Sequence, residues 1–188
     1  MRLQIPAHAK RVFKGVIFEV WQWKQKMFDG STEVFEMLKR PNTAVIIPTV
    51  RDKILILEQL QPNWKHSRLS LPGGRCDWGE DSLKAAQREL LEETGYQSDD
   101  WKLWKEQSPV GKMEWTVFTY IARNCSKVEN PRLDAGEKVT PRMITFDEFL
   151  MLSKDPSFYE KELAGILLMM RADRKLRDEF YRLLFPNG

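Results

Sequence analysis

Hydrophobic and polar positions begin to alternate close to the N-terminus. Apolar residues stand at every second position over 16–20, and apolar character resumes over 34–38. Between the two stretches, Asp29-Gly30 is a strong hairpin signal. The pattern therefore predicts a β-hairpin over residues 15–39, and one this long and apolar is not expected to stand alone in water.

Two nearly continuous apolar runs follow Pro41. They are TAVIIPTV at 43–50 and KILILEQL at 53–60, joined by the polar pair Arg51-Asp52. Runs of this length without alternation are typical of strands that are buried on both faces. We expect two adjacent strands in the interior of a sheet.

The rest of the chain predicts a helix, more strands and then further helices. A glycine-rich loop at 72–79 precedes a helical pattern from about Ser82 to Thr94, and Gly95 is a natural C-terminal stop. Further strands are expected at 101–106, at 113–123 and, as a short last strand, at about 139–145. From Phe146 onward the pattern is helical. This layout predicts an α/β fold, with a mixed sheet covered by helices.

Composition narrows the class of protein. The 188 residues are 42% hydrophobic and 30% charged, as in an ordinary globular domain with a modest extension. No apolar run approaches the roughly 18 residues of a membrane span, and the N-terminal segment lacks the apolar stretch of a signal peptide. Cys76 and Cys125 are expected to be free thiols of a cytoplasmic protein. The net charge of +3 is scattered, so nucleic-acid binding is not indicated.

Three glutamates crowd one side of the predicted helix. On a helical wheel, Glu89, Glu92 and Glu93 fall within an arc of roughly 100°, beside the apolar face that carries Leu90. Taken alone, such a cluster is more often a solvated face. Its mutual repulsion would be offset by a hard cation such as Mg²⁺ or Mn²⁺. Arg88 can hold one carboxylate with a forked hydrogen bond.

The spacing of the whole segment is more specific than the cluster. Residues 74–96 read G-x5-E-x7-R-E-L-x-E-E-x-G-Y, which resembles the Nudix box at every defined position. The resemblance implies a Nudix fold and metal-dependent hydrolysis of a nucleoside diphosphate linked to another group. It implies a mixed sheet sandwiched between helices, with the hairpin as an N-terminal extension.

The resemblance also implies roles for individual residues. Glu89 and Glu93 would be the principal metal ligands, Glu92 a further or water-mediated ligand, and the Gly73 carbonyl would complete the site. Glu92 and Arg88 are also expected to be catalytic residues. In this family, the residue at Glu80 supports the geometry between loop and helix.

The flanking segments resemble one branch, the ADP-ribose and nucleoside-diphosphate-sugar pyrophosphatases. In that branch the N-terminal strands are exchanged within a homodimer, so residues 1–40 are expected to be a dimerising extension and residues 41–188 the Nudix domain. Arg40 matches a substrate-binding position, although it also reads as a plain surface arginine. SPVGKME at 108–114 resembles a branch motif that places Glu114 among the substrate-binding residues.

The loop LDAGEK at 133–138 resembles the acidic loop of the family. Glu137 is expected to be the catalytic base and an extra metal ligand, with Asp134 in reserve, whereas the competing interpretation is a solvated loop acid. The chain departs from the branch pattern at three positions. Gln61 replaces a common phosphate-binding arginine, Ser70 replaces an acidic residue, and Ala135 stands where one form of the loop has a Glu.

Two tryptophans are candidates for binding a nucleobase. Trp21 and Trp23 are two positions apart on a predicted strand, so they share one face and could stack on a flat ring. The alternative is that they belong to the core or to the dimer interface. Phe28 is a weaker candidate.

The leading hypothesis is a Mg²⁺-dependent hydrolase of a nucleoside diphosphate sugar, which releases a nucleoside monophosphate and a sugar phosphate. One alternative is a Nudix hydrolase of nucleoside triphosphates or RNA 5′ ends. Another is a Nudix domain that binds a nucleotide without cleaving it.

Overall fold

Strand β4 (Thr43–Val50) is the centre of the fold. The computed structural model describes residues 4–133, 136 and 138–186. β4 pairs with β5 (Lys53–Leu60) in antiparallel fashion and with β11 (Val117–Arg123) in parallel fashion. Both apolar runs are therefore interior strands, as predicted.

The main sheet runs in the order β13-β5-β4-β11-β9. Its outer strands are β13 (Lys138–Ile144) and β9 (Asp100–Gln107). Two short strands in the glycine-rich region join it, β6 (Arg68–Ser70) on β5 and β7 (Gly73–Arg75) on β4. β8 (Tyr96–Gln97) and β12 (Ser126–Lys127) form a separate small pair.

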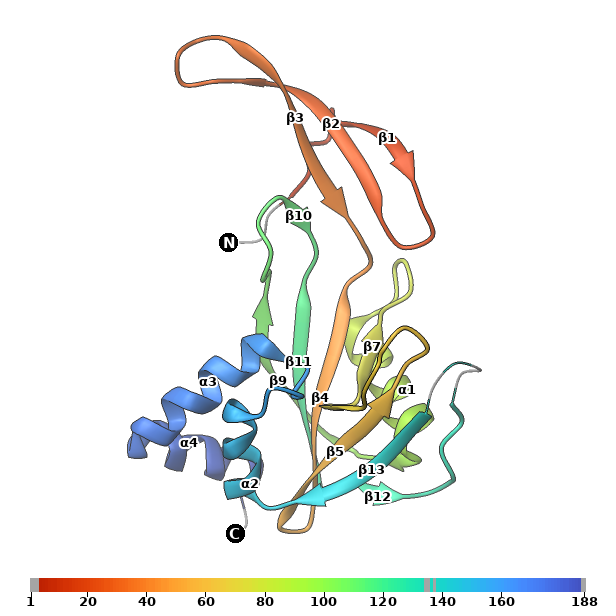
Figure 1. Cartoon of the computed structure of the whole chain (residues 1–188), viewed down its shortest axis with the longest axis vertical. Coiled ribbons are helices and arrows are strands. Elements are labelled where there is room, and N and C mark those ends of the chain that lie inside the picture. Colours follow the sequence, from red (N-terminus) through yellow and green to blue (C-terminus); the bar gives the residue numbers. More distant parts are fainter. Residues whose placement is uncertain (1–3, 134–135, 137, 187–188) are drawn as a thin grey trace.

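Helices cover both faces of this sheet (Figure 1). Helix α1 (Ser82–Thr94) packs on one face, against Ala44 and Ile46 of β4. The other face, which includes Ile47, is covered by the C-terminal helices. These are α2 (Phe146–Met151), the 3₁₀ turn η1 (Leu152–Lys154), α3 (Lys161–Ala172) and α4 (Arg174–Leu184). The expected mixed sheet between helices is confirmed.

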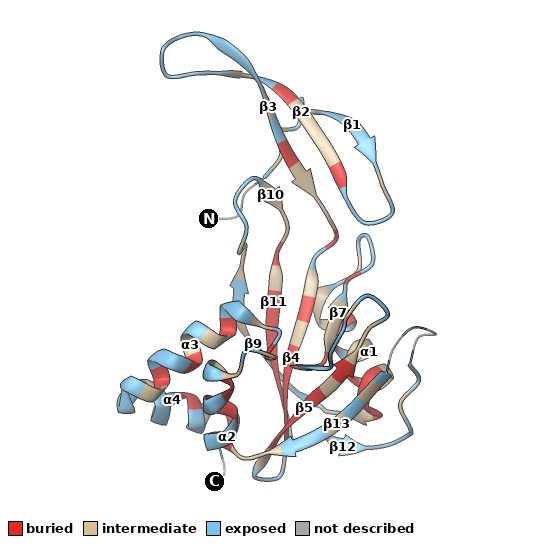
Figure 2. Cartoon of the chain, in the orientation of Figure 1, coloured by how far each residue is buried: buried red, intermediate tan, exposed pale blue. Residues whose placement is uncertain are grey.

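Burial is concentrated in β4, in β5 and on the inner sides of the helices (Figure 2). Alternate residues of β4 serve the two cores, because successive side chains of a strand point to opposite faces. Phe149, Phe158 and Phe180 are fully buried among the C-terminal segments. None of the helices in the described part of the chain has the length and apolar character that a membrane crossing requires.

The ends of α1 are fixed by local chemistry. The side chain of Asp81 accepts hydrogen bonds from the backbone N–H groups of Leu83 and Lys84. At the other end, Gly95 has a left-handed φ of 72°, and its N–H donates to the Leu91 carbonyl. The helix therefore begins and ends where the sequence predicts.

The N-terminal strands form a second sheet that projects from the body (Figure 1). The predicted hairpin is β2 (Glu19–Lys26) with β3 (Thr32–Lys39), paired from Glu19–Lys39 to Lys26–Thr32. We call residues 10–39 the arm. Its first strand, β1 (Lys10–Lys14), was not predicted, because all five residues are exposed and show no alternation.

The predicted strand at 113–123 is divided between the two sheets. β10 (Met113–Glu114) pairs with β3 of the arm, and β11 continues in the body. At the break, the side chain of Asn42 accepts a hydrogen bond from the Thr116 N–H, and Thr43 Oγ1 accepts one from Trp115 Nε1. Two side chains at the start of β4 thus hold the segment that crosses from one sheet to the other.

Candidate active site

A cavity of about 950 Å³ opens where β4 and β5 diverge. These strands pair with each other only beside their turn, at Thr49–Ile54 and Val50–Lys53. Farther along, β7 takes the place next to β4 and β6 the place next to β5. The loop and helix of the Nudix-like segment thereby form one wall of the cavity.

Two glycines let the backbone of this segment lie against the acidic helix. The Gly73 N–H donates a 2.8 Å hydrogen bond to Oε2 of Glu93. A Cβ at Gly73 would collide with the Ala44 carbonyl, and a Cβ at Gly74 would collide with the Glu89 carboxylate. The absence of these side chains is what allows loop, β4 and α1 to meet.

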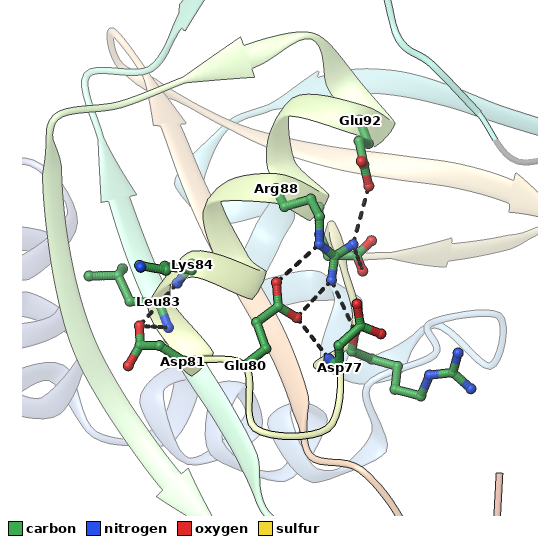
Figure 3. Close-up of polar contacts among 9 residues, drawn as sticks. Asp77, Glu80, Asp81, Leu83, Lys84, Arg88 and Glu92 are labelled. Atoms are coloured by element: carbon green, nitrogen blue, oxygen red, sulfur yellow. Dashed lines mark hydrogen bonds and ion pairs between the residues drawn. The ribbon is translucent and has the colours of Figure 1, made fainter.

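Arg88 gathers the acidic groups at this wall (Figure 3). Its guanidinium donates to both carboxylate oxygens of Glu80, to Glu89 at 2.7 Å, to Glu92 at 3.2 Å and to the Arg75 carbonyl. The hydrogen bonds with Glu80 are the largest cause that raises the pKa of Arg88 and lowers that of Glu80. Arg88 was expected to hold one carboxylate, and it holds three.

The donor set of α1 fits a hard divalent cation in its chemistry. Glu89, Glu92 and Glu93 all line the cavity and present carboxylate oxygens. Within residues 4–133, 136 and 138–186, no three acidic, histidine or cysteine side chains are close enough to hold a metal ion as they stand. Arg88 binds one carboxylate oxygen each of Glu89 and Glu92, while Glu93 accepts a hydrogen bond from the Gly73 N–H.

A cationic group faces the cavity from the end of the arm. The Arg40 guanidinium lies 4.7 Å from the ring centroid of Trp115 and 5.7 Å from that of Phe18. Burial lowers the pKa of Arg40, and the like charge of Arg75 lowers it further. No carboxylate among the described residues forms an ion pair with Arg40, so this end of the cavity suits an anion.

The lining of the cavity also includes residues that the sequence did not single out. Arg68, Trp64 and Tyr159 pack together there, and Glu160 lies next to them in the chain. Glu160 Oε2 is buried without a hydrogen-bond partner in the described part of the structure, and burial raises the pKa of this carboxyl group to about 8. Because their chain segments meet only in the folded protein, spacing along the chain gave no signal.

Three of the predicted substrate-binding residues lie away from the cavity in the single chain. Trp21 and Trp23 are on the arm, where Trp21 Nε1 donates to Glu19 and the Trp23 ring packs 5.1 Å from Phe35. Glu114 forms an ion pair with Lys39 at 2.5 Å and accepts a hydrogen bond from the Ile5 N–H. The ion pair joins the arm to β10, and the hydrogen bond from Ile5 joins the segment before the arm to the same strand.

Glu137 and Asp134, the two candidates for the catalytic base, lie outside the described residues, as does Ala135. Gly136, which lies between the two candidates, is next to Pro62, the neighbour of the cavity residue Gln61. Glu137 therefore stays a prediction.

The two cysteines lie in the core around α1. Cys76 and Cys125 are buried and unbonded to each other. Burial raises the pKa of Cys76 to about 11 and that of Cys125 to about 12. Both groups are neutral thiols near pH 7, which is the unreactive form.

Comparisons with known proteins agree with this geometry. A family model described as the NUDIX domain matches residues 38–175. The chain is 31% identical to the methanol dehydrogenase activator of Bacillus methanolicus, over 81% of this chain and 84% of the relative. It is 26% identical to the ADP-ribose pyrophosphatase of Bacillus subtilis (strain 168), over 89% and 92% of the two chains. A crystal structure of an ADP compounds hydrolase superposes with a TM-score of 0.71 at 23% identity, covering 88% of this chain and 91% of the other.

Proposed function

The chain belongs to the Nudix family, and on this premise we propose that it hydrolyses the pyrophosphate bond of a nucleoside diphosphate sugar similar to ADP-ribose. The products would be a nucleoside monophosphate and a sugar phosphate. The names of two relatives support this choice, since one is an ADP-ribose pyrophosphatase and another, from Escherichia coli (strain K12), is the ADP compounds hydrolase NudE.

One observation carries the proposal. The carboxylates of α1 and the guanidinium of Arg40 border the same cavity, at different walls. A pyrophosphate is an anion that needs both a metal to neutralise it and a cation to position it. The cavity offers the first through Glu89, Glu92 and Glu93 and the second through Arg40.

We infer that Mg²⁺ or Mn²⁺ is the cofactor. Glu89 and Glu93 would be its principal ligands, with Glu92 as a further ligand and the Gly73 carbonyl beside them. The ion would supply positive charge to the pyrophosphate. Arg88 would keep its bonds to Glu80, which hold the loop to the helix, while it releases the carboxylates that bind the ion. Arg88 and Glu92 thus remain in the proposed catalytic set.

Glu137 is proposed to accept the proton of the attacking water. Replacing a general base typically slows turnover by roughly 10²- to 10⁴-fold. We therefore expect Glu137→Gln to lower kcat by that range and to change KM much less, with Asp134→Asn as the matched variant of the same loop. Steady-state kinetics on ADP-ribose checks this. If Asp134→Asn lowers kcat and Glu137→Gln does not, Asp134 is the base in place of Glu137.

The arm is proposed to join two copies of the chain into a homodimer. Large apolar side chains remain exposed on it, including Val12 at 53%, Phe13 at 58%, Val16 at 96% and Val34 at 67%. Contiguous exposed apolar surface commonly marks an interface. In such a dimer, Trp21 and Glu114 would be candidates for reaching the partner's cavity, whereas Trp23 is only 8% exposed and already packs on Phe35 of its own arm.

To test the activity, the purified protein is incubated with Mg²⁺ and one substrate at a time. The products are then resolved by chromatography. The substrates are ADP-ribose, ADP-glucose, GDP-mannose and a set of nucleoside triphosphates. We expect a nucleoside monophosphate and a sugar phosphate from at least one of the first three. If those three survive while a triphosphate is consumed, the proposed substrate class is wrong.

A further inference from the structure

Arg68 occupies a defined place on the cavity side of the β5–β6 pair. In the register of these strands, Arg68 lies opposite Gln59, a buried residue that lines the cavity. Side chains directly opposite each other in an antiparallel pair share a face of the sheet. Arg68 itself lines the cavity, so its guanidinium lies on the same side as Gln59.

Two aromatic rings hold the Arg68 side chain. Its guanidinium carbon lies 4.5 Å from the centroid of Trp64 and 5.8 Å from that of Tyr159, and the two rings are 5.3 Å apart. Tyr159 is fixed in turn, because its N–H donates a 2.8 Å hydrogen bond to the Leu69 carbonyl. A guanidinium stacked on rings keeps its N–H groups free at its edge, where they can bind an oxyanion in a forked manner.

Arg68 differs from other arginines of the chain in its partners. Arg11, Arg88, Arg123 and Arg142 each form an ion pair with a carboxylate. Within the part of the chain that the structure describes, the Arg68 side chain has no such ion pair and donates no hydrogen bond, and its guanidinium lies against the two rings. Glu58 precedes Gln59 on β5 and therefore points to the other face of the sheet. There its carboxylate forms an ion pair with Arg142 at 3.2 Å. The charge of Arg68 thus borders the cavity without a carboxylate partner among the described residues.

We propose that Arg68, held by Trp64 and Tyr159, binds an oxyanion of the substrate, namely a phosphate oxygen. This inference rests on the proposed function and adds a second cationic contact to that of Arg40. Gln61, two residues beyond Gln59, also lines the cavity and has no charge to offer, whereas Arg68 brings a cation to the same region. Arg68 is a substrate-binding residue and takes no part in proton transfer.

The test compares Arg68→Met, Arg68→Lys and the control Arg142→Met. Methionine keeps an apolar stem that can lie on Trp64 and removes only the charged fork. Lysine keeps the charge without the fork. Arg142 is an exposed arginine of the same sheet that does not line the cavity. All three proteins are expected to keep the melting temperature of the wild type within about 2 °C, because exposed positions contribute little to stability.

Steady-state kinetics with ADP-ribose and Mg²⁺ supplies the readout. A charged hydrogen bond lost from ground state and transition state alike raises KM and spares kcat. We expect Arg68→Met to raise KM by about tenfold or more with kcat within about threefold, Arg68→Lys to fall between, and Arg142→Met to match the wild type. A wild-type KM in Arg68→Met overturns the inference, and so does an equal rise in Arg142→Met.

The same series separates this inference from the proposed function. If the wild type ignores ADP-ribose but cleaves a nucleoside triphosphate, the proposed substrate class fails, and the KM comparison is made with that triphosphate. A rise specific to Arg68→Met on the triphosphate still supports oxyanion binding by Arg68. An unchanged KM there overturns it.

Discussion

At the scale of the residue, Glu93 is buried and accepts a hydrogen bond from the backbone of the glycine-rich loop. Its side chain accepts the Gly73 N–H, and the residue is only 7% exposed. Replacing this proposed metal ligand by Gln would remove its charge and keep the size of the side chain. We expect Glu93→Gln to lower kcat by two or more orders of magnitude with the fold intact, because the ion that offsets the pyrophosphate charge is held more weakly. Kinetics across a Mg²⁺ titration checks this, and near-normal turnover with normal Mg²⁺ dependence would remove Glu93 from the site.

Glu160 links the folding equilibrium to pH. Its pKa is about 8 in the folded chain, against an ordinary value of 4.5. The folded state therefore keeps a proton that the unfolded state releases, so the stability contributed by this group is complete below about pH 4.5 and is lost as the pH rises to about 8. Glutamine cannot ionise. The quantity to compare is the melting temperature of Glu160→Gln minus that of the wild type. We expect this difference to be at least about 3 °C larger at pH 8 than at pH 4.5.

Calorimetry of the metal-free protein at the two pH values makes this measurement. Glu179→Gln is the control, since Glu179 is an exposed glutamate of α4 that does not contribute to the shifted pKa of Glu160. A Glu160→Gln difference that is the same at both pH values would contradict the linkage.

At the scale of the element, the end of α1 depends on one glycine. Gly95 has a φ of 72°, and a Cβ there would meet the Glu129 carbonyl. Gly95→Ala is expected to destabilise the protein by about 1–3 kcal/mol, because both the left-handed conformation and the collision oppose a side chain.

Gly165→Ala gives the comparison, because this glycine lies inside α3 with no atom within 4 Å of the position of a Cβ. It is expected to stabilise the helix by up to about 1 kcal/mol. Urea unfolding of both variants measures the two effects. If both variants change the free energy of unfolding by a similar, small amount, the end of α1 is not constrained as described.

The elements that the sequence predicts well are those with local determinants. Helix α1 has its cap, its period and its terminal glycine within the chain segment itself, and the boundaries at Ser82 and Thr94 follow from them. Strand β1 lacks any local pattern. Arg68 and Glu160 were missed for another reason, because the first depends on the register of β6 with β5 and the second on the packing of segment 158–160 against β6.

At the scale of the whole molecule, the proposed role of the arm is to set the oligomeric state. We expect light scattering to give the mass of a homodimer at micromolar concentration, because the apolar side chains of the arm remain exposed in the single chain. Replacing Phe13 and Val16 together by Asp should shift the mass toward the monomer. Leu103→Asp, at an exposed apolar position of the body, should leave it unchanged. A wild-type monomer across the concentration range would exclude the exchange of arms.

The parallel pairing of β4 with β11 also bears on how the chain folds during synthesis. The hydrogen bond that links Thr116 to Asn42 joins positions 74 residues apart, and the ladder of β4 with β11 begins directly after it. Until residue 123 has left the ribosome, β4 lacks its parallel neighbour, while the hairpin of β2 with β3 can already close. Contacts of such large sequence separation slow folding. The nascent chain would thus display an apolar strand for the time that the ribosome needs to add those residues, which makes this interval the one in which a chaperone has a segment to bind.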